Sequence, residues 1–441
     1  MNSILTDTKM VLMPAWKSVT FVGMRITILA YGSRGDVQPH IALGYGLARA
    51  GYQVRIAAPE RFASLAAEHG LDFSPLAGDP SELSVAFVDR AGTNPIKEVQ
   101  VMAEYVNPLA QQVWLDIQSA CRDCDVIIHS FMMMLSGHIM AEQLGVPQVS
   151  THLFPAFFPT KEFHVPSVPK LNNGIYNWIS HFAFQWAFWQ GGRFANNYLV
   201  RCKGADLPLV KVWPLGKDVQ PPIPVLYGIS PSVLPRPADW PPQAHMTGYW
   251  FLDEREDWQP SHELQQFLQA GRPPIYIGFG SMMTKKQERL IEIVTEAVQL
   301  SGQRAVLFSG WAGLTANHLR DQFFVTQDIP HSWLFPRMAA IVHHGGAGTT
   351  AASFRSGKPQ VVVPFTADQP FWAERVYRSG AGTKPLPYRK LSAAKLAAAI
   401  RQAVENSAIC LRAIELGKII QQEEGVINAV KIIQAHIEKH D

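Results

Sequence analysis

The stretch that decides the fold is Val342-His343-His344-Gly345-Gly346-Ala347-Gly348-Thr349-Thr350. The apolar residues 339–342 predict a buried strand, and the glycines predict a turn into a helix that begins near Ala347. Glycines let the backbone approach a ligand closely, and a helix N-terminus presents free N–H groups and a positive dipole. The stretch therefore predicts a cradle for a diphosphate without a metal. An ordinary turn with two core histidines remains the alternative interpretation.

A second strand, expected at 360–363, is followed by a polar pair, Asp368 and Gln369. Parallel strands bring their carboxyl ends to one edge of a sheet, so this pair is expected beside the glycine turn. A carboxylate and an amide suit the hydroxyls of a sugar. The pair also fits the start of a helix with Pro370 in its first turn, and the two interpretations are compatible.

Composition limits the class of protein. The 441 residues are 47% hydrophobic and 17% charged, which is typical of a folded chain of about two domains. The net charge of +3 gives no argument for nucleic acid. Cys121 and Cys124 form a lone C-x-x-C without a second pair, so we expect reduced thiols in a cytoplasmic protein rather than a zinc site.

The order of expected elements indicates an α/β fold with two Rossmann-like domains facing across a cleft. Alternating strands and helices predict a parallel sheet in each half. The expected division is an N-terminal extension (1–23), a first domain (24–225), a proline-rich linker (226–245), a second domain (246–420) and a helical tail (421–441). The extension has no convincing signal-peptide pattern, and no stretch predicts a transmembrane helix.

Five motifs, in order, resemble those of the family 1 nucleotide-sugar glycosyltransferases, which have the GT-B fold. They are Gly32-Ser33-Arg34-Gly35-Asp36-Val37-Gln38-Pro39, Gly278-Phe279-Gly280-Ser281, His343 to Thr350, Asp368-Gln369-Pro370-Phe371-Trp372 and Lys384-Pro385-Leu386-Pro387. Within the family, the chain is most similar to the sterol 3-beta-glucosyltransferases and to the bacterial enzymes that glycosylate antibiotics, including glycopeptides. In that family, the tail packs back on the first domain.

The resemblance implies an inverting, metal-independent hexosyltransferase with no cofactor. Asp36, at the mouth of the first strand, is the expected base on the acceptor hydroxyl, although it could simply cap the next helix. His343 is the expected phosphate histidine, with His344 left open as the alternative. The remaining residues expected to bind the nucleotide sugar are Ser281, Ile329, Trp333, His344, Gly346, Gly348, Thr349, Asp368 and Gln369.

Aromatic residues crowd positions 154–198, where the alternating pattern breaks. They predict one or two core helices beneath the wall between the domains, a lipophilic acceptor pocket, or a patch that rests on a membrane. The residues expected in the acceptor pocket are Phe154, Phe157, Phe158, Phe163, Trp178 and Trp186.

Two short motifs suggest other functions and are set aside. Asp123-Cys124-Asp125 matches the D-x-D of metal-dependent transferases, but it precedes a strand, at the wrong end for the cleft. Arg34-Gly35-Asp36 spells an adhesion tripeptide, but it lies between a buried strand and a helix. A non-catalytic partner protein and a sugar-nucleotide epimerase remain weaker alternatives.

The expected partners are UDP-glucose or a related nucleotide sugar and a lipophilic hydroxyl compound, with no nucleic acid. Sterol, hopanoid, carotenoid, polyketide and flavonoid acceptors all fit an aromatic pocket, and a TDP- or UDP-deoxysugar remains an alternative donor. Contact with the inner face of the membrane is also left open.

Overall fold

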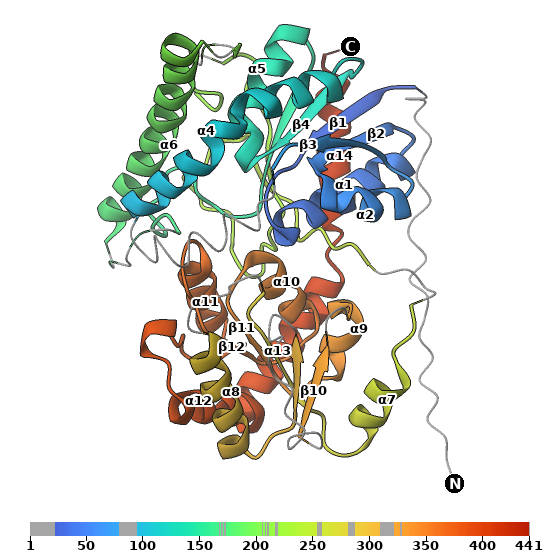
Figure 1. Ribbon diagram of the computed structural model, residues 1–441, viewed down its shortest axis with the longest axis vertical. Helices are drawn as coiled ribbons and strands as arrows, with labels where there is room; N and C mark the ends of the chain where they lie inside the picture. The colour runs from blue at the N-terminus through green and yellow to red at the C-terminus, as the bar shows by residue number, and fades with distance from the viewer. Residues whose placement is uncertain are drawn as a thin grey trace.

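A computed structural model describes residues 23–78, 95–166, 168, 171, 173–204, 206–207, 209, 211–216, 219–253, 258–280, 287–308, 322–326 and 329–440. Two α/β domains lie one above the other, with the first domain at the top of Figure 1. The expected pair of Rossmann-like domains is confirmed. Within the described ranges, every helix is too short or too polar to cross a bilayer.

The first domain is built on a seven-stranded parallel sheet with the order β3-β2-β1-β4-β5-β6-β7. Its strands are β1 (Arg25–Leu29), β2 (Gln53–Pro59), β3 (Asp72–Leu76), β4 (Val126–Ser130), β5 (Gln148–His152), β6 (Val225–Tyr227) and β7 (Ala244–Met246). Its helices are α1 (Arg34–Arg49), α2 (Ala63–Glu68), α4 (Pro95–Ala120), α5 (Met134–Leu144) and α6 (Gly174–Lys203), with short turns η1 (Glu60–Phe62) and η3 (Phe131–Met133).

The second domain has a five-stranded parallel sheet with the order β10-β9-β8-β11-β12. Its strands are β8 (Ile275–Gly278), β9 (Ala305–Phe308), β10 (Phe323–Thr326), β11 (Ile341–His343) and β12 (Gln360–Val362). Its helices are α7 (His262–Gln269), α8 (Gln287–Ser301), α9 (His331–Leu334), α10 (Ala347–Arg355), α11 (Gln369–Arg378), α12 (Ala393–Glu405) and α13 (Ser407–Gln421), with η4 (Phe335–Arg337) and η5 (Tyr388–Lys390).

Both sheets reverse their strand order at one point, between β1 and β4 in the first domain and between β8 and β11 in the second. Open parallel sheets bind ligands outside the carboxyl ends of their strands at such a point. Most strand residues are buried, as Ile26, Ile28 and Val342 illustrate, because helices cover both faces of a parallel sheet.

The chain between the domains differs from the expected linker at 226–245. This segment contributes β6 and β7, which extend the first sheet beyond β5. Its prolines fall mainly in the loop between these two strands, where a missing N–H does not break the ladder. Sheet residues of the first domain therefore continue to Met246.

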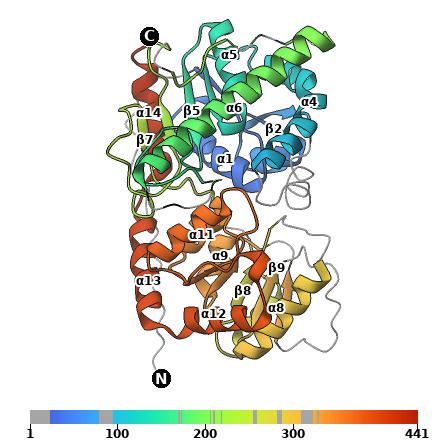
Figure 2. The same ribbon diagram turned by 90° about the vertical axis from the view of Figure 1, so that its left-hand side faces the viewer.

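The last helix, α14 (Gly425–Ile437), belongs to the first domain although it ends the chain. Figure 2 shows α13 in the lower domain and α14 beside the upper sheet. Ala429, Val430 and Ile433 are fully buried in the same core as Ile26 and Ile41. The chain thus crosses between the domains a second time, near residues 421–425.

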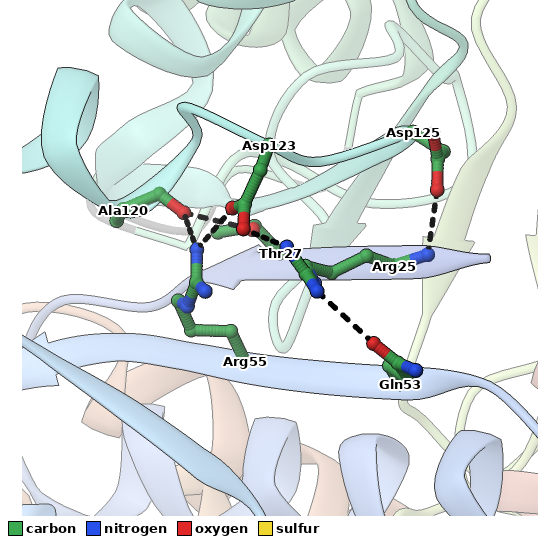
Figure 3. A network of polar contacts seen from close by, with 7 residues as sticks. All are labelled: Arg25, Thr27, Gln53, Arg55, Ala120, Asp123 and Asp125. Atoms are coloured by element: carbon green, nitrogen blue, oxygen red, sulfur yellow. Dashed lines mark hydrogen bonds and ion pairs between the residues drawn. The ribbon is translucent and has the colours of Figure 1, made fainter. Parts of the chain in front are cut away.

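The D-x-D residues lie at the amino-terminal edge of the first sheet, in the network of Figure 3. Asp123 pairs with Arg25 and with Arg55, whose Nη1 donates to Asp123 Oδ1 at 2.7 Å. Asp125 Oδ2 accepts the backbone N–H of Arg25 at 2.7 Å. These carboxylates join β1, β2 and the turn before β4, on the edge of the sheet opposite the carboxyl ends.

We expect Gly425→Ala to lower the free energy of unfolding by about 1–3 kcal/mol, because an overpacked site forces its neighbours to shift. A Cβ there would press on the carbonyl oxygen of Tyr249 and lie 2.7 Å from the carbonyl carbon of Gly248. Chemical denaturation measures the effect. As a control, Gly191→Ala, whose Cβ would meet nothing within 4 Å, should leave stability unchanged or raise it. Equal stability of Gly425→Ala and wild type would contradict this packing.

Candidate active site between the domains

A cavity of about 1870 Å³ lies between the two domains and is lined from the carboxyl ends of both sheets. Its walls include Tyr31 after β1, Phe131 after β4, His344 after β11 and Thr366 after β12. Sites for a single small ligand usually measure about 300–1,000 Å³. The cavity therefore has room for two ligands at once.

Two helix N-termini meet in this cavity. A Cβ on Gly348, in the first turn of α10, would lie 3.5 Å from the Cα of Gly35, in the first turn of α1. The first N–H groups of a helix have no partner within it, and each N-terminus carries about half a positive charge. An anion held between the domains at this point would be stabilised by both helices.

Asp36 lies in the first turn of α1 and lines the cavity. The backbone N–H of Ser33 donates to Asp36 Oδ2 at 2.7 Å, and the Ser33 hydroxyl donates to the same oxygen at 2.8 Å. The helix begins three residues earlier than Val37, with Ser33 as its N-cap residue. Asp36 therefore takes part in a capping box and also borders the cavity, so its structural role and the proposed catalytic role coexist.

Burial raises the pKa of Asp36 above its ordinary value, while the two bonds from Ser33 and the charge of Arg61 partly oppose that shift. Behind it, His40 Nδ1 donates to the carbonyl oxygen of Asp36 at 2.6 Å. Burial lowers the pKa of His40 to about 4, so the ring is neutral and its Nε2 can accept the Thr151 hydroxyl at 2.9 Å. The carboxylate is thus held on a rigid turn.

The two adjacent histidines have different places. His343 ends β11 and is completely buried, and it does not border the cavity. Its Nδ1 accepts the N–H of Gly345 at 3.1 Å, so its Nε2 carries the proton and donates to Gln360 Oε1 at 3.0 Å. His344 borders the cavity, and its Nδ1 is buried without a partner among the described residues.

These positions favour His344 as the side chain that meets an anion and make His343 a support for the glycine turn. Successive side chains along a strand point to opposite faces. At the end of β11, His343 and His344 therefore point in different directions. Burial lowers the pKa of His343 to about 3 and that of His344 to about 4. Both rings are therefore neutral near pH 7, and each carries one proton for donation.

Asp368 and Gln369 lie side by side on the cavity wall. Gln369 Oε1 accepts the backbone N–H groups of Phe365 at 2.8 Å and Thr366 at 3.2 Å, and Asp368 Oδ2 accepts Trp372 Nε1 at 2.8 Å. Between them and β12, Ala367 has a φ of +54°, which is rare for a residue with a side chain. The turn that presents the pair is therefore held in an uncommon backbone conformation, as often occurs at binding sites.

Ile329 and Trp333 line the same cavity from the loop before α9 and from α9 itself. The ring of Trp258 lies 5.1 Å from that of Trp333, and Arg337 covers Trp333 at 4.0 Å. This arrangement gives the second domain an aromatic wall that suits a planar ring. Ser281 lies outside the described residues.

The six residues expected in the acceptor pocket separate into three groups. Phe154 lines the cavity. Phe157, Phe158 and Phe163 are buried in core packing, where Phe163 meets Phe371 of α11 at 5.6 Å. Trp178 and Trp186 are exposed on the outer side of α6. Of the six residues expected in the acceptor pocket, the structure brings only Phe154 to the cavity wall.

Other aromatic residues supply the apolar wall in the first domain. They include Tyr31, Tyr105, Trp114, Phe131, Phe184, Phe188, Tyr249 and Trp250. Phe131 follows β4, so the rule of strand carboxyl ends could have identified it. Phe184 and Phe188 face inward one turn apart on α6, but the sequence does not distinguish them from their outward neighbours, because this helix is apolar on nearly every side.

Two family models match the chain. The glycosyltransferase family 28 N-terminal domain matches residues 26–163, and the C-terminal domain of erythromycin biosynthesis protein CIII-like proteins matches residues 292–422. The first match covers β1 to β5 and the turn that carries Asp36, and the second covers β9 to α13, including the glycine turn.

The chain is similar to several curated transferases. It is 37% identical over 422 residues to the O-mycaminosyltylonolide 6-deoxyallosyltransferase of Streptomyces fradiae, covering 93% of this chain and 97% of the relative. It is 33% identical over 429 residues to a sterol 3-beta-glucosyltransferase of Arabidopsis thaliana, and the match covers 94% of this chain and 68% of the relative. A sterol 3-beta-glucosyltransferase of Debaryomyces hansenii is 34% identical over 429 residues, and the chain spans 27% of that protein's length.

Solved structures share the fold at low sequence identity. The glycotransferase of kitacinnamycin superposes with a TM-score of 0.67 at 17% identity, covering 93% of this chain and 98% of that one. A glycosyltransferase of Streptomyces sp. SF2575, complexed with thymidine diphosphate, gives a TM-score of 0.62 at 20% identity. The match covers 93% of this chain and 99% of that one. These similarities confirm the GT-B architecture.

We expect Gly346→Ala to weaken the binding of inorganic pyrophosphate roughly tenfold, about the loss of one hydrogen bond to a charged group. A Cβ on Gly346 would lie 2.5 Å from His344 Nε2 and displace the ring. Titration calorimetry in EDTA measures the affinity. As a control, Asp123→Ala should bind as wild type does. Unchanged pyrophosphate affinity in Gly346→Ala would contradict an anion site at this turn.

Proposed function

Because the chain belongs to the glycosyltransferase family that includes the sterol 3-beta-glucosyltransferases and the antibiotic glycosyltransferases, we propose that it moves a hexose, glucose from UDP-glucose, to the hydroxyl of a lipophilic acceptor such as a sterol. The observation that carries the proposal is that Asp36 and the N-terminus of α10 border one large cavity with an apolar wall in the first domain. The transfer inverts the configuration of the sugar and uses no metal.

The donor binds to the second domain. The diphosphate lies at the N-terminus of α10, against the N–H groups near Gly346, Gly348 and Thr349, with His344 as a neutral donor. The uracil ring rests on the wall formed by Ile329 and Trp333. Asp368 and Gln369 bind the hydroxyls of the sugar, which favours a fully hydroxylated hexose over a deoxysugar. Ser281 remains a proposed contact to the diphosphate or ribose.

Asp36 acts as the general base. As the acceptor oxygen attacks the anomeric carbon, its proton passes to the Asp36 carboxylate and the bond to the diphosphate oxygen breaks. The sugar passes through an oxocarbenium-like transition state. One carboxylate on the acceptor side suffices for a single displacement, so the configuration inverts.

The negative charge that grows on the leaving diphosphate is stabilised from both domains. The α10 N–H groups and His344 approach from one side and the N-terminus of α1 from the other, and Gly35 and Gly348 mark how closely the two helices meet. Preorganised donors of this kind are typically worth about 3–4 kcal/mol each. These groups supply the role that a divalent ion has in other transferases.

The acceptor lies against the aromatic wall of the first domain, with Phe154, Phe131, Phe184 and Phe188 as its main contacts. Aromatic side chains bury large apolar areas and form tight walls around fused ring systems. The aromatic lining and the size of the cavity support a bulky hydrophobic acceptor, and contact with a membrane would be the means of reaching one.

A second candidate is the transfer of a deoxysugar from a TDP donor to an antibiotic aglycone. The Streptomyces fradiae relative, named as a 6-deoxyallosyltransferase, favours it because the two chains match over nearly their full lengths. Release of nucleoside diphosphate from UDP-glucose and from a TDP-deoxysugar, each with a sterol and with a macrolide aglycone, separates the two. Turnover with only the TDP-sugar and macrolide would favour the second candidate.

Asp36→Asn is expected to lower the rate of transfer about 10²–10⁴-fold, the usual effect of losing a general base. Because the amide keeps the shape of the side chain, the affinity for UDP should remain. A UDP-release assay in EDTA with UDP-glucose and a sterol measures the rate, and Asp123→Asn is the matched control at the opposite edge of the sheet. Full activity of Asp36→Asn, or activity that depends on a divalent ion, would refute this mechanism.

The rate should also fall at low pH, because the base must be ionised. Burial raises the pKa of Asp36, so kcat/KM should decline through a pKa above the ordinary value for aspartate. Ser33→Ala removes a hydroxyl that stabilises the carboxylate, so it should move this acid limb to higher pH while the plateau falls only modestly. A pH profile of kcat/KM measures both. If Ser33→Ala leaves the acid limb of the profile where it is in wild type, a group other than Asp36 is responsible for that limb.

A further inference from the structure

Helix α6 has two apolar faces that meet different surroundings. Figure 2 looks onto this helix, which runs diagonally across the outside of the first domain. Its inner face borders the cavity with Tyr176, Ser180, Ala183, Phe184, Ala187 and Phe188. Its outer face is also apolar, whereas a helix on the surface of a globular protein usually turns a polar face to water.

The outer face consists of residues three or four positions apart. Ile175, Trp178, Phe182 and Trp186 lie on one side, and the last three are 43%, 52% and 56% exposed. The rings of Trp178 and Phe182 stack at 5.8 Å with an angle of 7°. A contiguous exposed patch of large aromatic residues is uncommon on a soluble monomer and indicates a binding surface.

The charge of this region indicates the partner. Residues 163–205 contain Lys170, Arg193, Arg201 and Lys203 but no aspartate or glutamate. Arg193 follows the aromatic face along α6 and lies over the ring of Trp189 at 5.7 Å. Aromatic residues beside arginines match the interface of an anionic bilayer, where rings enter the headgroup region and cations meet phosphates.

We propose that the outer face of α6 docks on an anionic lipid bilayer, so that the cavity behind the helix receives its acceptor from the membrane. The reason is that one helix forms both surfaces: its inner residues line the cavity, and its outer residues face away from the protein. α6 lies flat rather than crossing the bilayer, because it is not apolar enough to span one. The docking surface stands on its own observations, and the delivery of acceptor rests on the proposed function.

The first test is the binding of the full chain to vesicles in the absence of substrate. Wild type should co-sediment with vesicles of equal phosphatidylcholine and phosphatidylglycerol, bind pure phosphatidylcholine less, and be released by salt. The triple variant Trp178→Ser, Phe182→Ser, Trp186→Ser should lose roughly tenfold or more in partitioning. A matched triple variant, Leu300→Ser, Tyr377→Ser, Leu411→Ser, removes exposed apolar side chains from the second domain and should bind as wild type does.

A second readout locates the contact without a disruptive change. Lipids brominated in their acyl chains should quench part of the tryptophan fluorescence of wild type, and Trp178→Phe with Trp186→Phe should remove most of that quenching. Wild type that binds neither vesicle, or a serine variant that binds equally well, would overturn the proposal. A dimer of wild type that the serine variant dissociates, without vesicle binding, would also overturn it and assign the face to a second copy.

Transfer assays separate this proposal from the proposed function. The serine variant should keep wild-type turnover on an acceptor dispersed in detergent and lose it on the same acceptor in anionic vesicles. If no acceptor is turned over in either form, the proposed function fails while vesicle binding still decides the docking surface. If wild type and the serine variant turn over the detergent-dispersed acceptor and the vesicle-bound acceptor equally well, the proposal that the acceptor is delivered from the membrane is wrong.

Discussion

The close approach of Gly35 and Gly348 is the constraint on which the rest of the site depends. Two helices, one from each domain, direct their N-termini at one point, where a Cβ on Gly348 would already touch the backbone of Gly35. The same turn of α1 carries Asp36, so the proposed base and the proposed anion site are brought together by one contact. Parallel sheets make this arrangement natural, because every strand delivers its loop to the same edge.

Most of the fold follows from the sequence because its signals are local. Apolar β-branched runs, glycine turns and helical periodicity predict the two sheets and the glycine turn before α10 with errors of a few residues at the ends. The segment 226–245 was harder, since its strands β6 and β7 have three residues each and lie among prolines. So short a strand has no periodicity of its own, and its place depends on pairing with β5.

The sequence predicted which motifs form the site, but not the direction in which each side chain points. Asp36, His344, Asp368 and Gln369 all border the cavity, as expected from the edge where their strands end. The sequence could not determine which of His343 and His344 faces it, because that depends on the orientation of β11. Because α6 is apolar on nearly every side, the sequence does not show which of its residues face the cavity. Only the packing of Phe184 against Phe157 in the core distinguishes it from the exposed Trp186.

The position of α14 has a consequence for how the protein folds during its synthesis. Its residues fill the same core as β1, β2 and α1, although nearly four hundred residues of chain separate β1 from α14. Domains near the N-terminus usually fold while synthesis continues. Here the first domain lacks one wall of its core until residues 425–437 have been synthesised, so its apolar surface stays uncovered while the second domain is made.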